Sequence, residues 1–134
     1  MKITLEQSGA LYTLHSYREG VIRVRPPNGI SNDDEALIIV NSSCLISGGT
    51  LSREWAPQSL AELSEAHLAP IVALQPEVIL IGTGPQLLQP TAEQRVALIK
   101  LGRGYEVMDT AAACRTYNVL IAEGRRVVAA LFVA

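Results

Sequence analysis

The sequence predicts an α/β protein built on one mixed β-sheet with helices packed against it. From residue 78 onward, apolar runs typical of buried strands alternate with capped helical segments, the order expected for right-handed crossovers between parallel strands. The first half is instead rich in short strands bounded by turns. Hydrophobic residues make up 49% of the chain and aromatic residues only 4%, so we expect an aliphatic core. A chain of 134 residues corresponds to a single domain, residues 1–134.

Charge and cysteine usage exclude several classes of protein. The formal net charge is −2 and Lys and Arg form no runs, so we expect no nucleic-acid partner. Cys44 and Cys114 stand alone, and the N-terminus lacks the apolar region of a secretory signal, which indicates reduced thiols and a cytoplasmic location. The longest apolar run, residues 127–134, is far shorter than the ~20 residues of a membrane-spanning helix. We therefore expect no transmembrane segment.

Turn formers divide the first half into short strands. Alternation over residues 11–17 and an apolar run at 21–24 predict a β-hairpin that turns at Gly20. Residues 26–34 are dense in Pro, Asn, Gly and Asp, which predicts a surface loop. Three further runs predict strands: residues 37–40, 44–46 and 50–54.

The middle of the chain is predicted to be helical and then to enter the sheet. Ser64 can cap a helix that runs through Leu74, with a kink at Pro70. Residues 78–81 are four consecutive β-favouring apolar residues, a pattern typical of a strand covered on both faces.

A second helix and a further strand follow. Thr91-Ala-Glu-Gln94 matches a capping box, which predicts a helix over residues 92–101 that ends at Gly102. Its spacing indicates that Val96 and Ile99 are buried. Two more strands are expected, at residues 105–108 and 126–132.

A glycine turn directly after a buried strand is the first candidate site. Gly82, Thr83 and Gly84 leave the carboxyl end of the strand at 78–81, where open α/β sheets bind ligands. Such glycines let backbone N–H groups approach a pyrophosphate. The dinucleotide-binding pattern is incomplete, because Pro85 removes a donor and the third glycine is absent. We therefore expect a turn at the border of a cleft and no bound cofactor.

The start of the last helix is the second candidate site. Asp109 or Thr110 is expected to cap this helix, and Gly124 to end it. Arg115 and Asn118 fall three residues apart on one face, which suits a small anion. An acidic N-cap disfavours an anion, so pairing of Arg115 with Asp109 or another nearby carboxylate is the interpretation that we favour.

The sequence indicates no catalytic residues. Cys114 falls on the predicted inner face of the last helix, which is typical of a small buried hydrophobic residue. His15 and His67 are placed on a hairpin surface and a helix turn, not beside a nucleophile. Two isolated histidines and two isolated cysteines give no metal-ligand spacing, so we also expect no metal.

Six motifs with specific spacing cover residues 76–131: Pro76-Glu77, Gly82-Thr83-Gly84, Glu106-Val-Met-Asp-Thr110, Ala113-Cys-Arg-Thr-Tyr-Asn118, Glu123-Gly-Arg125 and Val128-Ala-Ala-Leu131. With these motifs the chain resembles the Mth938-like family, a domain of unknown function also labelled DUF498. The resemblance extends over roughly residues 10–133. This family includes the mitochondrial respiratory complex I assembly factor 3.

The resemblance implies a three-layer α/β fold with a central mixed sheet, and a role in assembly or interaction with a protein partner rather than catalysis. It carries over no catalytic residues. Residues 102–105 and the acidic segment 28–35 depart from the family pattern in loops, where a partner surface can differ. The alternative is a small-anion or metabolite-binding domain, enzymatic or not, that uses the cleft between Gly82–Gly84 and the helix Asp109–Asn118.

Overall fold

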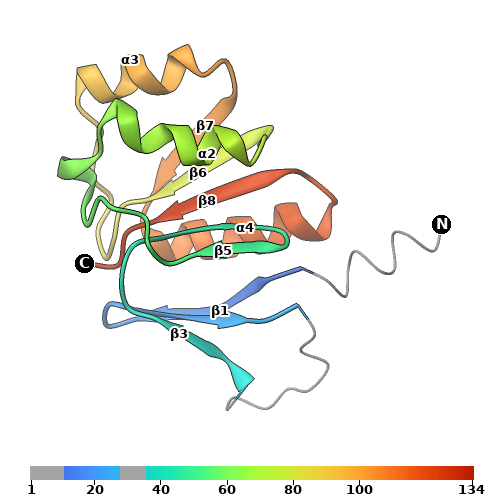
Figure 1. Cartoon of the computed structure of the whole chain (residues 1–134). Coiled ribbons are helices and arrows are strands. Elements are labelled where there is room, and N and C mark those ends of the chain that lie inside the picture. The colour runs from blue at the N-terminus through green and yellow to red at the C-terminus, as the bar shows by residue number, and fades with distance from the viewer. Residues whose placement is uncertain (1–10, 28–35) are drawn as a thin grey trace.

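A computed structural model describes residues 11–27 and 36–134 of the chain (Figure 1). The acidic segment 28–35 and the N-terminal residues 1–10 lie outside the described residues. The strands are β1 (Thr13–Arg18), β2 (Val21–Arg25), β3 (Ile38–Val40), β4 (Cys44–Ser47), β5 (Thr50–Ser52), β6 (Val78–Gly82), β7 (Gly104–Met108) and β8 (Val127–Leu131). The helices are the short 3-10 helices η2 (Leu60–Glu62) and η3 (Glu65–Leu68) and the α-helices α2 (Ala69–Ala73), α3 (Ala92–Lys100) and α4 (Thr110–Ala122).

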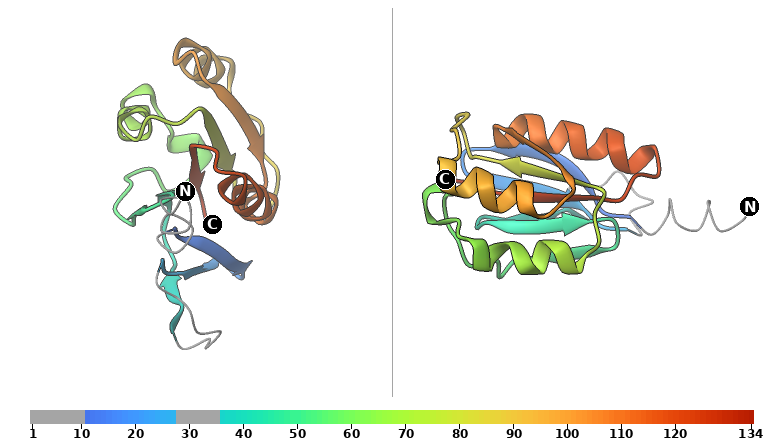
Figure 2. Two further views of the ribbon diagram at one scale, coloured as in Figure 1. Left: turned by 90° about the vertical axis from the view of Figure 1, so that its right-hand side faces the viewer. Right: turned by 90° about the horizontal axis from the view of Figure 1, so that it is seen from above.

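The central sheet is mixed and has five strands in the order β5-β4-β8-β6-β7. Strand β6 is parallel to both β7 and β8, whereas β4 is antiparallel to β5 and β8. The predicted parallel crossovers after residue 78 are therefore confirmed. Helices α2 and α3 cover one face, and α4 with the first three strands covers the other, which gives three layers (Figure 2).

The prediction of one sheet is wrong for the first three strands. They form a separate antiparallel sheet in the order β1-β2-β3. Contacts with α4 explain this separate sheet. The Tyr117 hydroxyl donates to the carbonyl of Tyr12 at 3.0 Å, and the Asn118 amide donates to the carbonyl of Leu14. These contacts hold β1 across α4, so it cannot extend the edge of the central sheet.

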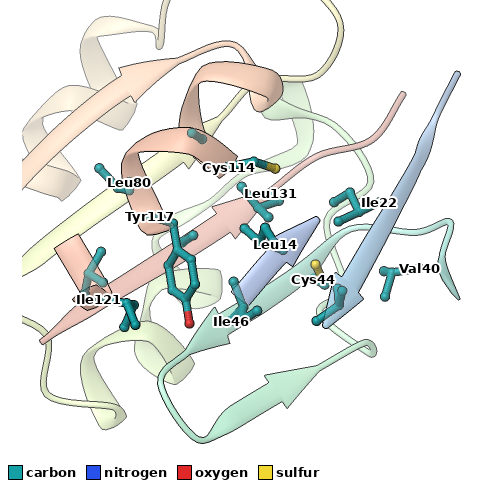
Figure 3. Packing of buried hydrophobic residues seen from close by; sticks show 14 of the residues in the cluster. Leu14, Ile22, Val40, Cys44, Ile46, Leu80, Cys114, Tyr117, Ile121 and Leu131 are labelled. Atoms are coloured by element: carbon teal, nitrogen blue, oxygen red, sulfur yellow. The ribbon is translucent and has the colours of Figure 1, made fainter. Parts of the chain in front are cut away.

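Two aliphatic cores lie on the two faces of the central sheet. Strand β8 is buried throughout, and its residues alternate between the cores. The core beneath α4 and the small sheet includes Tyr117, Cys114 and Leu131 (Figure 3). In the other core, Trp55 stacks on Phe132 with ring centroids 5.2 Å apart. The prediction that β6 is buried on both faces is confirmed, because its residues also divide between the two cores.

The helix predicted from Ser64 to Leu74 is broken into η3 and α2. Pro70 lies in the first turn of α2, so it begins this helix and does not kink a longer one. The first turn is where proline costs least, because its missing N–H would have no helical partner.

Helix α3 begins where the sequence predicts, but the side of the helix that it buries is not the predicted one. The capping box is confirmed, because Thr91 Oγ1 accepts from the Gln94 N–H at 3.1 Å and the Thr91 N–H donates to Gln94 Oε1 at 3.0 Å. Val96 and Ile99, predicted to be buried, are 53% and 64% exposed, and Leu98 is buried instead. The Gln94 side-chain amide donates to two carbonyls of the segment around η2, which turns the face with Leu98 toward the sheet.

Helix α4 is the longest helix in the described part of the chain, with 13 residues. None of the helices described here combines the length and apolar character that a membrane crossing requires.

Candidate functional site

The glycine turn and the start of α4 lie side by side at the carboxyl edge of the central sheet. The Thr110 N–H donates to the Gly84 carbonyl at 2.9 Å, and the Gly84 N–H donates to Thr110 Oγ1 at 2.8 Å. The Thr83 N–H donates to the Met108 carbonyl at 2.9 Å, which extends the pairing of β6 with β7. The expectation that these two segments meet is confirmed.

The Thr110 hydroxyl occupies the point where three segments cross. It accepts from Gly84 and donates to the Phe132 carbonyl at 2.6 Å, and the residue is fully buried. Gly82 passes so close that a Cβ atom there would lie 2.9 Å from this hydroxyl. The hydroxyl is thus fully engaged in joining β6, β8 and α4, and Gly82 is the residue that permits the crossing.

Thr83 organises the loop that follows the glycine turn. Its buried hydroxyl donates to the Gln86 carbonyl at 2.6 Å and accepts from the Leu88 N–H at 3.1 Å. These two bonds hold residues 86–88 in a turn against Thr83. The side chains of Leu87 and Leu88 project from it, 53% and 46% exposed.

Asp109 and Asn118 both use their polar groups within the fold. Of the two predicted candidates, Asp109 is the N-cap of α4, and its Oδ1 accepts from the Ala112 N–H at 2.8 Å. Asn118 donates to the Leu14 carbonyl at 2.7 Å and accepts from the Leu14 N–H at 2.8 Å. It therefore lies against β1 and away from the glycine turn's network of hydrogen bonds.

Arg115 lies outside this network. Its side chain is exposed, and within residues 11–27 and 36–134 it forms no hydrogen bond or ion pair. The favoured pairing with Asp109 is wrong, because residues six positions apart lie on different sides of a helix; the Asp109 carboxylate caps α4 instead. The structure brings together five of the seven predicted site residues and leaves Arg115 and Asn118 apart from them.

Both cysteine side chains are buried in the core under α4, as predicted for Cys114. Burial raises the pKa of each thiol from the usual 9.0 to about 12. At neutral pH both sulfur atoms therefore stay protonated, and a thiol is a far weaker nucleophile than a thiolate.

The two histidines lie where the sequence places them. His15 is exposed on the small sheet, with its Nδ1 3.0 Å from a guanidinium nitrogen of Arg25. His67 lies in η3, and its Nδ1 accepts from the Ser64 N–H at 3.0 Å. Among the described residues, no group of three or more His, Cys, Asp and Glu side chains could hold a metal ion.

A groove of about 500 Å³ lies elsewhere, on the outer layer between α3 and the segment of η2 and η3. None of the seven predicted site residues lines it. The lining residues are Ala61, Leu63, Ser64, Glu65, Leu68, Thr91, Glu93, Gln94, Val96, Ala97 and Lys100.

Neither this groove nor the exposed pair Leu87 and Leu88 was predicted from the sequence. The pair had a signal, because two adjacent leucines between Pro85 and Pro90 fall in a segment otherwise typical of a turn. No pattern in the sequence indicates the groove, because its walls depend on the rotation of α3 about its own axis.

Residues 15–132 match the model of a family described as a protein of unknown function, DUF498/DUF598. Over 68 residues the chain is 40% identical to a 13 kDa major membrane protein of Francisella tularensis subsp. holarctica, covering 51% of this chain and 55% of that protein. Over 80 residues it is 38% identical to NADH dehydrogenase (ubiquinone) 1 alpha subcomplex assembly factor 3 of Danio rerio. This match covers 58% of this chain and 46% of that protein. The chain thus spans about half the length of these relatives.

Solved structures share the fold. An NMR structure of a Xanthomonas campestris protein is 36% identical, with a TM-score of 0.75 over 91% of this chain and 84% of that one. A solution structure from Bordetella pertussis, described as an Mth938-like domain, is 31% identical, with a TM-score of 0.67 over 92% and 86%. The resemblance to the Mth938-like family and its three-layer fold is confirmed.

Proposed function

Since the chain belongs to the DUF498/DUF598 family of proteins of unknown function, we propose that it binds other proteins and assists the assembly of a multi-subunit complex. The likeness to the Danio rerio protein named as a complex I assembly factor carries this proposal and points to a respiratory complex. We also propose that residues 1–134 act as one domain in the cytoplasm, where both thiols remain reduced.

The use of the polar groups at the sheet edge supports an interaction role. The hydroxyls of Thr83 and Thr110 and the side chains of Asp109 and Asn118 are all hydrogen-bonded within the fold. A ligand would have to displace these bonds to reach the same groups. This edge therefore suits a rigid support for a contact surface better than a binding cleft.

The exposed pair Leu87 and Leu88 forms the surface that a protein partner contacts. Leu87 and Leu88 project from a loop that Thr83 fixes, so ordering them costs little entropy when a partner binds. The two leucines are adjacent in the loop, and contiguous apolar surface often marks a contact with another protein. We propose that they bind an apolar surface of a subunit that is not yet assembled.

The anion-binding alternative is weaker. The Gly84 N–H, which a bound anion would need, already donates to Thr110, and the Asp109 carboxylate occupies the N-terminus of α4. Of the seven predicted site residues, Arg115 is the one whose side chain has no hydrogen bond or ion pair within the described residues, and an exposed arginine alone gives little affinity for an anion.

Deletion of the encoding gene tests the proposal. We expect less fully assembled respiratory complex I on native gels, with accumulation of a subassembly, and recovery when the full chain is supplied. Another multi-subunit membrane complex from the same cells is the control. Unchanged amounts of every respiratory complex after deletion would refute the proposed function.

A further inference from the structure

Helix α3 carries an apolar stripe that faces away from its own core. Ala92, Val96 and Ile99 follow one another at spacings of four and three residues, which places them along one side of the helix. All three side chains are exposed, whereas Leu98 is the buried residue of this helix. Figures 1 and 2 show α3 in the outermost layer.

Two opposite charges flank the stripe on the side of the groove. Glu93 lies in the first turn and Lys100 in the last, and both line the groove. They are seven positions apart, so they lie on the same flank of the helix, one near each end. In the described part of the chain neither side chain forms an ion pair.

This arrangement is complementary to itself. When two copies of α3 pack antiparallel about a two-fold axis, residues on the same flank but at opposite ends of the helix meet. Glu93 of one copy then lies opposite Lys100 of the other, and the reverse contact forms at the other end. The apolar stripes face one another between these two charge pairs, and the antiparallel helix dipoles add to the attraction.

We propose that α3 is the centre of a symmetric dimer in which the occupant of this face is a second copy of the same chain. Val96 and Ile99 of each copy pack against those of the other, and the groove beside α3 receives side chains at the edge of the contact. Self-association explains why the sequence has apolar residues at two positions that the single chain leaves exposed. It is independent of the proposed role in assembly, which uses the leucine pair.

The area of the contact surface on α3 indicates how tightly two copies should associate. Nine residues of α-helix extend only about 13 Å, so α3 alone covers less than the ~800 Å² that each partner buries in a standard interface. The groove walls on η2 and η3 supply the rest. We therefore expect a dimer that dissociates on dilution, with monomer and dimer both present over a measurable range of concentration.

Sedimentation velocity and light scattering over a dilution series of the full chain test the proposal. We expect a monomer–dimer equilibrium, and at least ~30-fold weaker association for both Val96→Glu and Ile99→Glu, as for a residue central to an interface. Val119→Glu is the matched control, because Val119 is an equally exposed valine on α4. It should dimerise like the unaltered chain, and far-ultraviolet circular dichroism checks that each variant is folded.

A charge swap makes the test specific for the antiparallel pairing. Glu93→Lys and Lys100→Glu should each weaken the dimer by about 10-fold, because each places like charges opposite one another. The double variant E93K/K100E restores the opposite pairs and should recover dimerisation. A chain that stays monomeric up to millimolar concentration overturns the proposal, as does a dimer that Val96→Glu leaves intact or a double variant no better than either single one.

Discussion

The side-chain amide of Asn118 pairs with the backbone of Leu14 as a neighbouring strand would. Its Nδ2 donates to the Leu14 carbonyl at 2.7 Å, and its Oδ1 accepts from the Leu14 N–H at 2.8 Å. Leu14 stands where the pairing of β1 with β2 changes register. One side chain of α4 therefore satisfies both backbone groups at this irregularity and joins the small sheet to the rest of the molecule.

Asn118→Ala should lower the free energy of unfolding by about 2 kcal/mol. The substitution leaves a partly buried N–H and a partly buried carbonyl without partners, and each such loss costs about 1 kcal/mol or more. Urea denaturation followed by circular dichroism measures the change. Val119→Ala, at the exposed neighbouring position, should change stability by less than ~0.5 kcal/mol. Equal effects of the two variants would mean that the Asn118 contact does not stabilise the fold.

Thr110→Val should destabilise the fold more than Thr110→Ser. Valine has nearly the shape of threonine but removes the hydroxyl that accepts from Gly84 and donates to Phe132, so two buried backbone groups lose their partner, at a cost of about 2–4 kcal/mol. Serine keeps both hydrogen bonds and loses only one methyl group, worth about 1 kcal/mol. Thermal and urea denaturation of the two variants under the same conditions show which one is less stable. A valine variant as stable as the serine variant contradicts this role of the hydroxyl.

The buried thiols predict how stability changes at high pH. Each thiol has a pKa of about 12 in the folded protein and about 9.0 when exposed. Below pH 9 both states keep their protons, so the stabilisation is complete. Between pH 9 and 12 the unfolded chain releases protons that the folded chain retains. Stability should therefore fall as pH rises, by about 1.4 kcal/mol per pH unit for each thiol.

Urea denaturation at several pH values between 8 and 11 measures this slope. Cys114→Ala removes one of the two thiols and should make the slope shallower, whatever it does to stability at pH 7. Thiol-specific reagents at pH 8 should label neither cysteine in the folded chain and both in urea. Rapid labelling of Cys44 or Cys114 under native conditions would show that the thiol is accessible after all.

Local patterns in the sequence predicted the second half of the fold well. The strand at 78–81, the capping box at Thr91 and the cap at Asp109 all depend on residues close in the chain, and the structure has each of them. The parallel pairing of these strands follows from the strand–helix–strand order, because each helix returns the chain to the end of the sheet where the previous strand began. These features could be predicted because neighbouring residues determine them.

The first half and the site depended on contacts between distant residues. Leu14 and Asn118 are 104 positions apart, and nothing in either segment alone indicates that the amide binds β1. The rotation of α3 is likewise set by Gln94 reaching carbonyls more than thirty residues earlier, so spacing alone put Val96 and Ile99 on the wrong face. The predicted pairing of Arg115 with Asp109 failed for a local reason, because residues six positions apart lie on different sides of a helix and the Asp109 carboxylate caps α4.

The most direct test of the interaction role compares two variants in a strain from which the gene has been deleted. One carries Leu87→Asp and Leu88→Asp, which make the contact loop polar, and the other carries Arg115→Ala, which removes the cation that an anion site would need. All three residues are exposed, so both chains should fold. Native gels then measure assembled respiratory complex. We predict that the Arg115 variant restores assembly and the leucine variant does not; restoration by the leucine variant, with failure of the Arg115 variant, would contradict the interaction role and favour anion binding.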